Sequence, residues 1–425
     1  AASILEAVET SDGRWRLPFV LGGIGVACIA LAFAAFIAAN WGGIPKYVKL
    51  GGIAVTIVAA HFLAAWAAGA GRKGIADLAT AFATLIFVGG MALVGQIYHL
   101  PSDWPGGAFL VCLGALAAAW MTGSRASLIV AAAAALTWQF GRSDIGTPEL
   151  GESLIGLALL AVILLHPVAY PNRLSRWAAI SLLLVTYGRW LADTTDWISA
   201  SEDLVFSIMV LGAAGLAAIM VQLGQVADLI VKWSSSYPQY GHGRWLMLRS
   251  LQDVGFALLA ILLVGVLLAS GEFEDASVLT ALSAAPVAAV LLPAVLLGAI
   301  GFLLSFKTGK AVTFFGAVLM ALAAIVLPVV IPNVLLAAAL VLAGLIGISL
   351  LGTVYNHAFW SLCGYAGLAA AALWLLYETV GTLLGQSLFF LVAGVFLIVM
   401  AYVATRLLRR QAARTAPKRD GEAPA

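Results

Sequence analysis

The chain has 425 residues, of which 63% are hydrophobic and only 10% are charged, and its mean hydropathy is +1.05. A soluble domain carries roughly 25% charged residues, so this composition excludes a protein whose surface mostly faces water. The formal net charge of +2 says little by itself, because membrane proteins distribute charge by side and not by total, and no nucleic-acid partner is expected.

A polar lead at residues 1–16 precedes a series of apolar runs, most of them long enough to cross a bilayer as helices. The first run exceeds the h-region of a cleavable signal, so we expect it to be retained. The predicted spans are 17–39, 50–69, 78–98, 106–122, 127–140, 154–170, 177–192, 204–223, 254–270, 280–305, 311–331, 333–354, 358–377 and 383–405. The fold class is therefore all-α, a polytopic transmembrane bundle of about 14 spans. The runs 106–122 and 127–140 are short, and a tilted or re-entrant hairpin there would lower the count to about twelve.

These spans suggest a division of the chain into six parts. They are a cytoplasmic lead at 1–16, five spans at 17–140, three spans at 141–223, a cytoplasmic interfacial connection at 224–253, six spans at 254–405, and a basic cytoplasmic tail at 406–425. The acidic segment from Trp190 to Asp203 is expected to be a solvated exterior loop. No charged residue is expected deep in a span, which disfavours an ion-coupled transporter.

The distribution of Lys and Arg predicts the orientation. With the amino terminus in the cytoplasm and the spans alternating, 18 of the 22 basic residues fall on the cytoplasmic side. The remaining four are Lys46, Lys49, Arg142 and Arg189. Cytoplasmic loops are enriched in basic residues, so both termini are expected to be cytoplasmic.

The densest group of chemically specific side chains lies between Gly95 and Trp104, at the outer end of the third predicted span. The first and fifth spans also end on the outer face, since they run in the same direction. Together these ends form a candidate outward-facing mouth of amide, imidazole, phenol and indole groups. Its candidate binding residues are Asn40, Trp41, Gln96, Tyr98, His99, Asp103, Trp104 and Trp138.

Two simpler interpretations apply to the same residues. Trp and Tyr at span ends form the aromatic belts of membrane proteins, which favours an anchoring role for each Trp taken singly. Amides at helix ends cap exposed carbonyls. For Gln96, Tyr98 and His99 taken together, binding and anchoring are equally favoured.

Few other residues suggest chemistry. His61 lies near the middle of a span, where a hydrogen bond to a neighbouring helix is favoured over a proton or substrate contact. The three cysteines lie in apolar runs without a CxxC pair, and the motifs of metal, nucleotide and serine-nucleophile sites are absent from the sequence. We therefore predict no metal, no cofactor and no catalytic residue.

Several of these residues resemble a known family. The segment Phe36-Ile37-Ala38-Ala39-Asn40-Trp41, then Pro45 to Leu50, then Gly95 to Leu100 with Asp103 and Trp104, is similar to the bacterial membrane family called domain of unknown function 2157. The similarity covers about residues 15 to 140, and the last span has a similar ending. The resemblance implies a bacterial inner-membrane protein. It brings no known activity, so it assigns no functional residue.

Three functions remain open, in this order. The first is a binding, assembly or accessory membrane protein whose mouth contacts an envelope lipid, a glycan or a membrane protein partner. The second is a permease or flippase for an amphipathic substrate. The third is an outer-leaflet enzyme using His99 and Asp103 as a base and its orienting partner. An enzyme is disfavoured.

Overall fold

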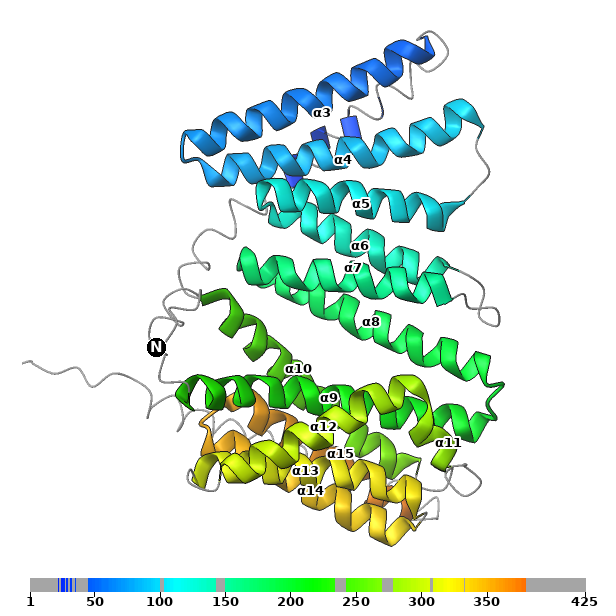
Figure 1. Cartoon of the computed structure of the whole chain (residues 1–425), viewed down its shortest axis with the longest axis vertical. Helices are drawn as coiled ribbons and strands as arrows, with labels where there is room; N and C mark the ends of the chain where they lie inside the picture. Colours follow the sequence, from blue (N-terminus) through cyan, green and yellow to red (C-terminus); the bar gives the residue numbers. More distant parts are fainter. Residues whose placement is uncertain are drawn as a thin grey trace, which may run out of the picture. The chain divides into compact units, whose positions relative to one another are not determined.

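The structure is a computed structural model of the chain that describes residues 45–99, 103–142, 150–233, 242–269, 278–305, 309–331 and 333–379, with scattered positions between 22 and 35. The described residues form helices and contain no strand. The helices are α3 (Lys46–Gly69), α4 (Lys73–Tyr98), α5 (Trp104–Thr122), α6 (Arg125–Gly141), α7 (Leu150–Ala169), α8 (Arg173–Trp197), α9 (Glu202–Trp233), α10 (His242–Leu268), α11 (Val278–Ser283), α12 (Ala285–Leu304), α13 (Gly309–Val330), α14 (Val334–Val354) and α15 (Ala358–Thr379) (Figure 1).

Ten helices in the described part of the chain are long and apolar enough to cross a membrane. Two further helices occupy predicted spans: α6 has only 17 residues, and α8 carries several charged residues. The all-helical membrane class is therefore confirmed. The predicted spans 17–39 and 383–405, the lead and the tail lie outside the fully described ranges. Large apolar side chains such as Met121, Leu335 and Phe62 point outward, 86%, 82% and 73% exposed, as lipid-facing residues do.

Some helices extend beyond the predicted spans. Helix α8 continues to Trp197, and Asp193 on it is only 1% exposed, so the segment from Trp190 to Asp203 is not a solvated loop. Only residues 198–201 separate α8 from α9. The predicted connection at 224–253 is mostly helical, since α9 ends at Trp233 and α10 begins at His242. Polar side chains lower the local hydropathy, so a hydropathy-based boundary is placed too early. The helix continues past that point because its backbone hydrogen bonds form with polar side chains as well as with apolar ones.

The chain forms two compact units, which divide the helices differently from the six predicted parts. Unit 1 comprises residues 1–190 and 239–247, and unit 2 comprises residues 191–238 and 248–425. In unit 1, α3 packs on α4, α4 packs on α5 and α6, and α6 packs on α7. In unit 2, α9 packs on α12 and α13, α13 on α14, and α14 on α15.

Small residues allow the helices of each unit to approach closely. In unit 1, a side chain at Gly90 of α4 would collide with Ile53 of α3. In unit 2, one at Gly364 of α15 would collide with Ser349 of α14. Helix association in lipid depends on this kind of contact, since apolar surface alone gives no preference over lipid.

Local signals set the helix ends that matter for the candidate site. The Asp103 carboxylate caps α5, and Pro105 follows in the first turn, where its missing N–H costs nothing. Helix α5 stops at Gly123, which adopts a left-handed φ of 66°. Ser124 then caps α6, accepting a hydrogen bond from the Ser127 N–H.

Candidate functional site

The carboxyl end of α4 presents the first part of the predicted mouth. Tyr98 is the last helical residue, and His99 adopts the left-handed conformation while its N–H donates to the Gly95 carbonyl. The His99 Nδ1 atom lies 2.9 Å from the Gln96 carbonyl oxygen. Because a carbonyl only accepts, the neutral ring carries its hydrogen on Nδ1 and presents Nε2 as an acceptor. Gln96, Tyr98 and His99 are all exposed.

Asp103 serves the next helix and does not serve His99. Its Oδ1 accepts a 2.8 Å hydrogen bond from the Gly106 N–H at the start of α5. Within the described ranges, no hydrogen bond or ion pair joins the Asp103 carboxylate to the His99 ring. Each side chain is bound to its own helix end, so the arrangement gives no support to a base with an orienting carboxylate.

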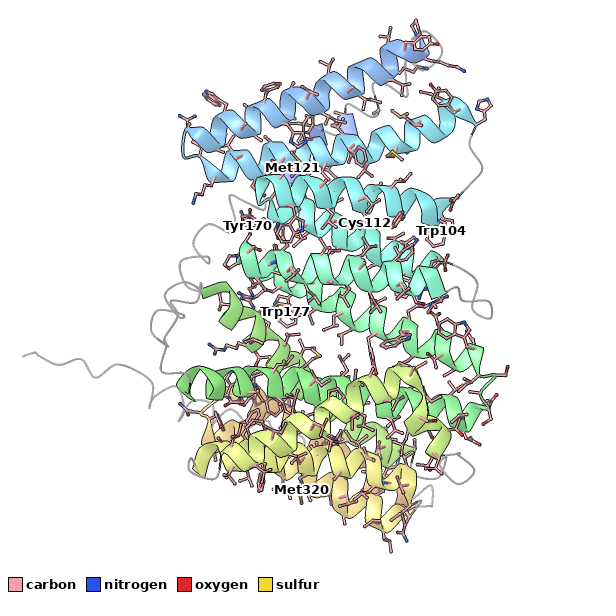
Figure 2. The ribbon with its side chains drawn as sticks, in the orientation of Figure 1. Trp104, Cys112, Met121, Tyr170, Trp177 and Met320 are labelled. Carbon is pink, nitrogen blue, oxygen red and sulfur yellow. The ribbon has the colours of Figure 1, made fainter. Side chains whose placement is uncertain are left out.

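Trp104 connects this helix end to the carboxyl end of α6. Its ring lies against Gly141, where a β-carbon would collide with the indole, yet 58% of Trp104 is exposed (Figure 2). Trp138, one turn earlier on α6, is only 6% exposed and packs against Phe109 with the ring centroids 5.6 Å apart. An aromatic belt needs an exposed indole, so that interpretation fits Trp104 and does not fit Trp138.

A buried polar network lies at the same end of α6, and the sequence did not predict it. Gln139 Nε2 donates to Thr186 Oγ1 of α8 at 3.0 Å, and Gln139 Oε1 accepts from Arg142 Nε at 2.9 Å. Arg142 Nη1 lies 3.4 Å from Ser153 Oγ and 3.7 Å from Glu152 Oε2, both on α7. Gln139 and Arg142 are 2% and 3% exposed. Gln139 and Arg142 together thus join α6, α7 and α8 of unit 1.

The sequence counted Arg142 among the four basic residues of the outer side and did not indicate that it would be buried. A guanidinium that is removed from water needs several acceptors, and Gln139 and Glu152 supply them. The guanidinium also lies 5.8 Å from the centroid of the Trp138 ring. The sequence did contain a signal for this cluster. Arg142 follows Gln139 by three residues and Trp138 by four, and residues at these spacings share a helix face.

Three predicted residues remain. Asn40 and Trp41 lie outside the described residues. His61 is half-buried on α3, and the hydrogen bonds found in the described ranges include none to its ring. The adjoining α3–α4 interface is packed by small side chains such as Ala60, Ala64 and Ala83.

A second polar cluster lies in unit 2, and the sequence analysis did not predict it. Asp253 Oδ1 of α10 accepts a 2.8 Å hydrogen bond from Trp360 Nε1 of α15 and lies 3.7 Å from His357 Nε2. The imidazole stacks on the Trp360 ring at a centroid distance of 4.4 Å. Burial lowers the pKa of His357, with a further lowering from Arg249 and an opposing rise from the Asp253 carboxylate.

The lowered pKa of His357 predicts that stability decreases with acidity. Below the ordinary histidine pKa of about 6.5, the unfolded chain binds a proton that the folded chain resists, so stability falls as pH falls through that value. The melting temperature in detergent, followed from about pH 8 to about pH 5 across this pKa, should fall less in His357→Gln than in the native chain. If the melting temperature of His357→Gln fell with pH as steeply as that of the native chain, the lowered pKa of His357 would not be the cause of the acid sensitivity.

Many apolar helices, lipid-facing surfaces and small-residue packing define the chain as an integral membrane protein. Residues 1–128 match the model of the family described as "Predicted membrane protein (DUF2157)". This match confirms the family resemblance that the sequence suggested over that part of the chain. Neither the curated proteins nor the solved structures contain a match to the chain.

Proposed function

We propose that this integral membrane protein binds an envelope lipid, a glycan or a membrane partner through a recognition surface made of Gln96, Tyr98, His99, Asp103 and Trp104. The observation that carries the proposal is the exposure of all five side chains at one helix junction. Two aromatic rings, an amide and an outward imidazole Nε2 can hold a ligand that has both polar and apolar parts.

The buried network beneath this surface supports the proposal. Trp104 rests on Gly141, one residue before Arg142, and the Arg142 network ties α6 to α7 and α8. A binding surface is more precise when its residues stand on rigid elements. The α6 end therefore holds the Trp104 ring in place while leaving more than half of it open.

We further propose that the recognition surface faces away from the cytoplasm in a bacterial inner membrane, with both chain termini cytoplasmic. The turns at the opposite ends of these helices carry Arg72, Lys73 and Arg173, as cytoplasmic turns do. Neither alternative function has comparable support. The α3–α4 interface beside His61 is packed by alanine and glycine, which does not favour a permease path there, and His99 and Asp103 each bind their own helix end.

One experiment tests both the side and the ligand. In a chain whose native cysteines are replaced by Ala, Tyr98→Cys is labelled in intact cells with a membrane-impermeant, thiol-directed photo-cross-linker. We expect labelling without lysis, and illumination should give adducts of one mass class. Met121→Cys, exposed at the opposite end of the helices, should be labelled only after lysis.

Lys46→Cys is the control on the same side, because α3 begins where α4 ends (Figure 1). It should be labelled in intact cells but should give only the general adducts of the bilayer. Labelling of Met121→Cys in place of Tyr98→Cys would overturn the orientation. Identical adducts from positions 98 and 46 would overturn the recognition surface while leaving the orientation intact.

A further inference from the structure

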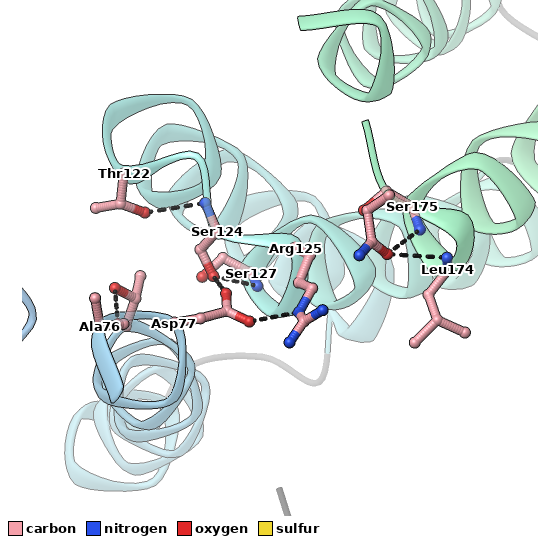
Figure 3. A network of polar contacts seen from close by, with 10 residues as sticks. Ala76, Asp77, Thr122, Ser124, Arg125, Ser127, Leu174 and Ser175 are labelled. Atoms are coloured by element: carbon pink, nitrogen blue, oxygen red, sulfur yellow. Dashed lines mark hydrogen bonds and ion pairs between the residues drawn. The ribbon is translucent and has the colours of Figure 1, made fainter. Parts of the chain in front are cut away.

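Three turns of unit 1 form one continuous surface at the helix ends opposite the recognition surface. Asp77, in the second turn of α4, accepts a 2.6 Å hydrogen bond from Ser124 and a 2.8 Å ion pair from Arg125 Nε (Figure 3). These contacts join the α3–α4 turn to the α5–α6 turn. Gly123 of the α5–α6 turn lies against the Tyr170 ring, which joins it to the α7–α8 turn.

This surface has an excess of basic residues. The only acidic side chain among the described residues of these turns and the adjoining helix starts is Asp77, and Ser124 and Arg125 already occupy both of its oxygens. Arg176 is only 4% exposed, so it does not contribute to the outward surface. Arg72, Lys73 and Arg173 are exposed, and the ion pairs found in the described ranges include none to them. Three outward cations therefore remain without a carboxylate in the described part of the chain.

Exposed aromatic rings accompany these cations. Trp66 is 62% exposed, and Tyr170 and Trp177 are each 43% exposed. The Arg72 guanidinium lies 5.9 Å from the centroid of the Trp66 ring, within the range of a cation–π contact. Indole and phenol rings occupy the depth of lipid headgroups, so this contact holds the guanidinium at that depth. We define Arg72, Lys73 and Arg173, with Trp66, Tyr170 and Trp177, as the basic rim.

We propose that the basic rim binds the headgroups of anionic phospholipids. Cations at headgroup depth attract anionic lipid, and phosphate oxygens accept the hydrogen bonds that Arg and Lys donate. The outward apolar side chains next to the rim, Phe62 and Leu63 on α3 and Met121 on α5, suit acyl chains. An acidic protein or a nucleic acid would not use such side chains.

The inference is independent of the proposed recognition surface, which lies at the other ends of the same helices (Figure 1). It also differs from the general bias of basic residues toward one side of a membrane. That bias requires only a charge excess, whereas the rim places one guanidinium over an exposed indole and joins three turns through Asp77 and Gly123. A specific contribution from each rim cation to lipid affinity is therefore expected.

The test uses the full chain purified in a neutral detergent. Phosphatidylglycerol or phosphatidylcholine is added in increasing amounts, and the melting temperature and the lipids retained in native mass spectrometry are measured. We expect phosphatidylglycerol to raise the melting temperature and to be retained, and phosphatidylcholine to do neither. Raising NaCl from about 0.1 M to about 1 M, which shortens the Debye length from about 10 Å to about 3 Å, should weaken the effect.

Substitutions then locate the site. Each basic residue near an anionic lipid surface contributes roughly five-fold in affinity, so Arg72→Gln/Lys73→Gln/Arg173→Gln should weaken the response to phosphatidylglycerol on the order of 100-fold. The charge-preserving variant Arg72→Lys/Lys73→Arg/Arg173→Lys should retain most of it. Lys46→Gln, which removes an exposed cation at the other end of α3, should retain all of it.

Several results would overturn the proposal. They are an equal response to both lipids, a full response in the triple Gln variant, and an equal loss in Lys46→Gln. Retention of an acidic protein in place of lipid, lost in the triple Gln variant, would also overturn it by showing that the rim binds protein. Because all three substituted side chains are exposed, the folded yield of the triple variant should match that of the native chain.

Discussion

Arg142→Met should destabilise unit 1 on the order of 3 kcal/mol, which is among the largest effects expected from a single substitution. Arg142 is 3% exposed, and its guanidinium contacts Gln139, Ser153 and Glu152 together. Removing it leaves the Gln139 oxygen without its donor and the Glu152 carboxylate without its cation. Thermal unfolding in detergent, followed by a fluorescence or light-scattering transition, measures the change.

Matched variants assign the loss to the buried network. Arg173→Met removes an exposed guanidinium and should change stability by less than about 0.5 kcal/mol. Arg142→Lys keeps the charge but loses the planar donors, so it should fall between the two. Adding Glu152→Gln to Arg142→Met should recover part of the loss, because the uncharged amide of Gln replaces a carboxylate that has lost its cation. If Arg142→Met lowered stability no more than Arg173→Met, the buried network would not stabilise unit 1.

Gln139→Met and Gln222→Met should change stability in opposite directions although the substitution is the same. Both amides are almost fully buried, Gln139 at 2% and Gln222 at 0%. Gln139 holds Thr186 and Arg142, so its loss leaves two buried partners unsatisfied, at a cost of roughly 2 kcal/mol. Neither Gln222 Nε2 nor Gln222 Oε1 has a hydrogen-bond partner among the described residues. Replacing that amide with an apolar side chain of similar size should raise stability by about 1 kcal/mol.

The same melting measurement on both variants provides the comparison. Methionine keeps the length of glutamine, so neither variant introduces a large cavity. If Gln222→Met lowered stability as much as Gln139→Met, the Gln222 amide would have a bound partner in the folded protein. That result would indicate a polar ligand site inside unit 2 and would support the permease alternative.

The recognition surface was partly predictable from the sequence. The proximity of Gln96, Tyr98 and His99 to a predicted helix end indicated that they would be exposed there, and the structure places them so. The sequence did not indicate that Asp103 would cap α5 or that Trp138 would be buried against Phe109. The Asp103 cap is a local contact with the Gly106 N–H that the sequence analysis did not consider. The burial of Trp138 depends on how α5 and α6 pack, because an aromatic residue near a span end has the same local pattern whether it is buried or exposed.

The sequence by itself determined the solvent, the helical class and the positions of most helices, because a bilayer requires long apolar segments with internally satisfied backbone groups. It also determined which helix ends carry the basic residues. Only the tertiary structure decided the environment of the polar side chains. Asp193 was expected in a solvated loop and is buried, Arg142 is buried beside Glu152, and His357 is paired with Asp253. Hydropathy sums over neighbours along the chain, whereas burial of a charge depends on partners such as Glu152 and Asp253 that only folding brings near.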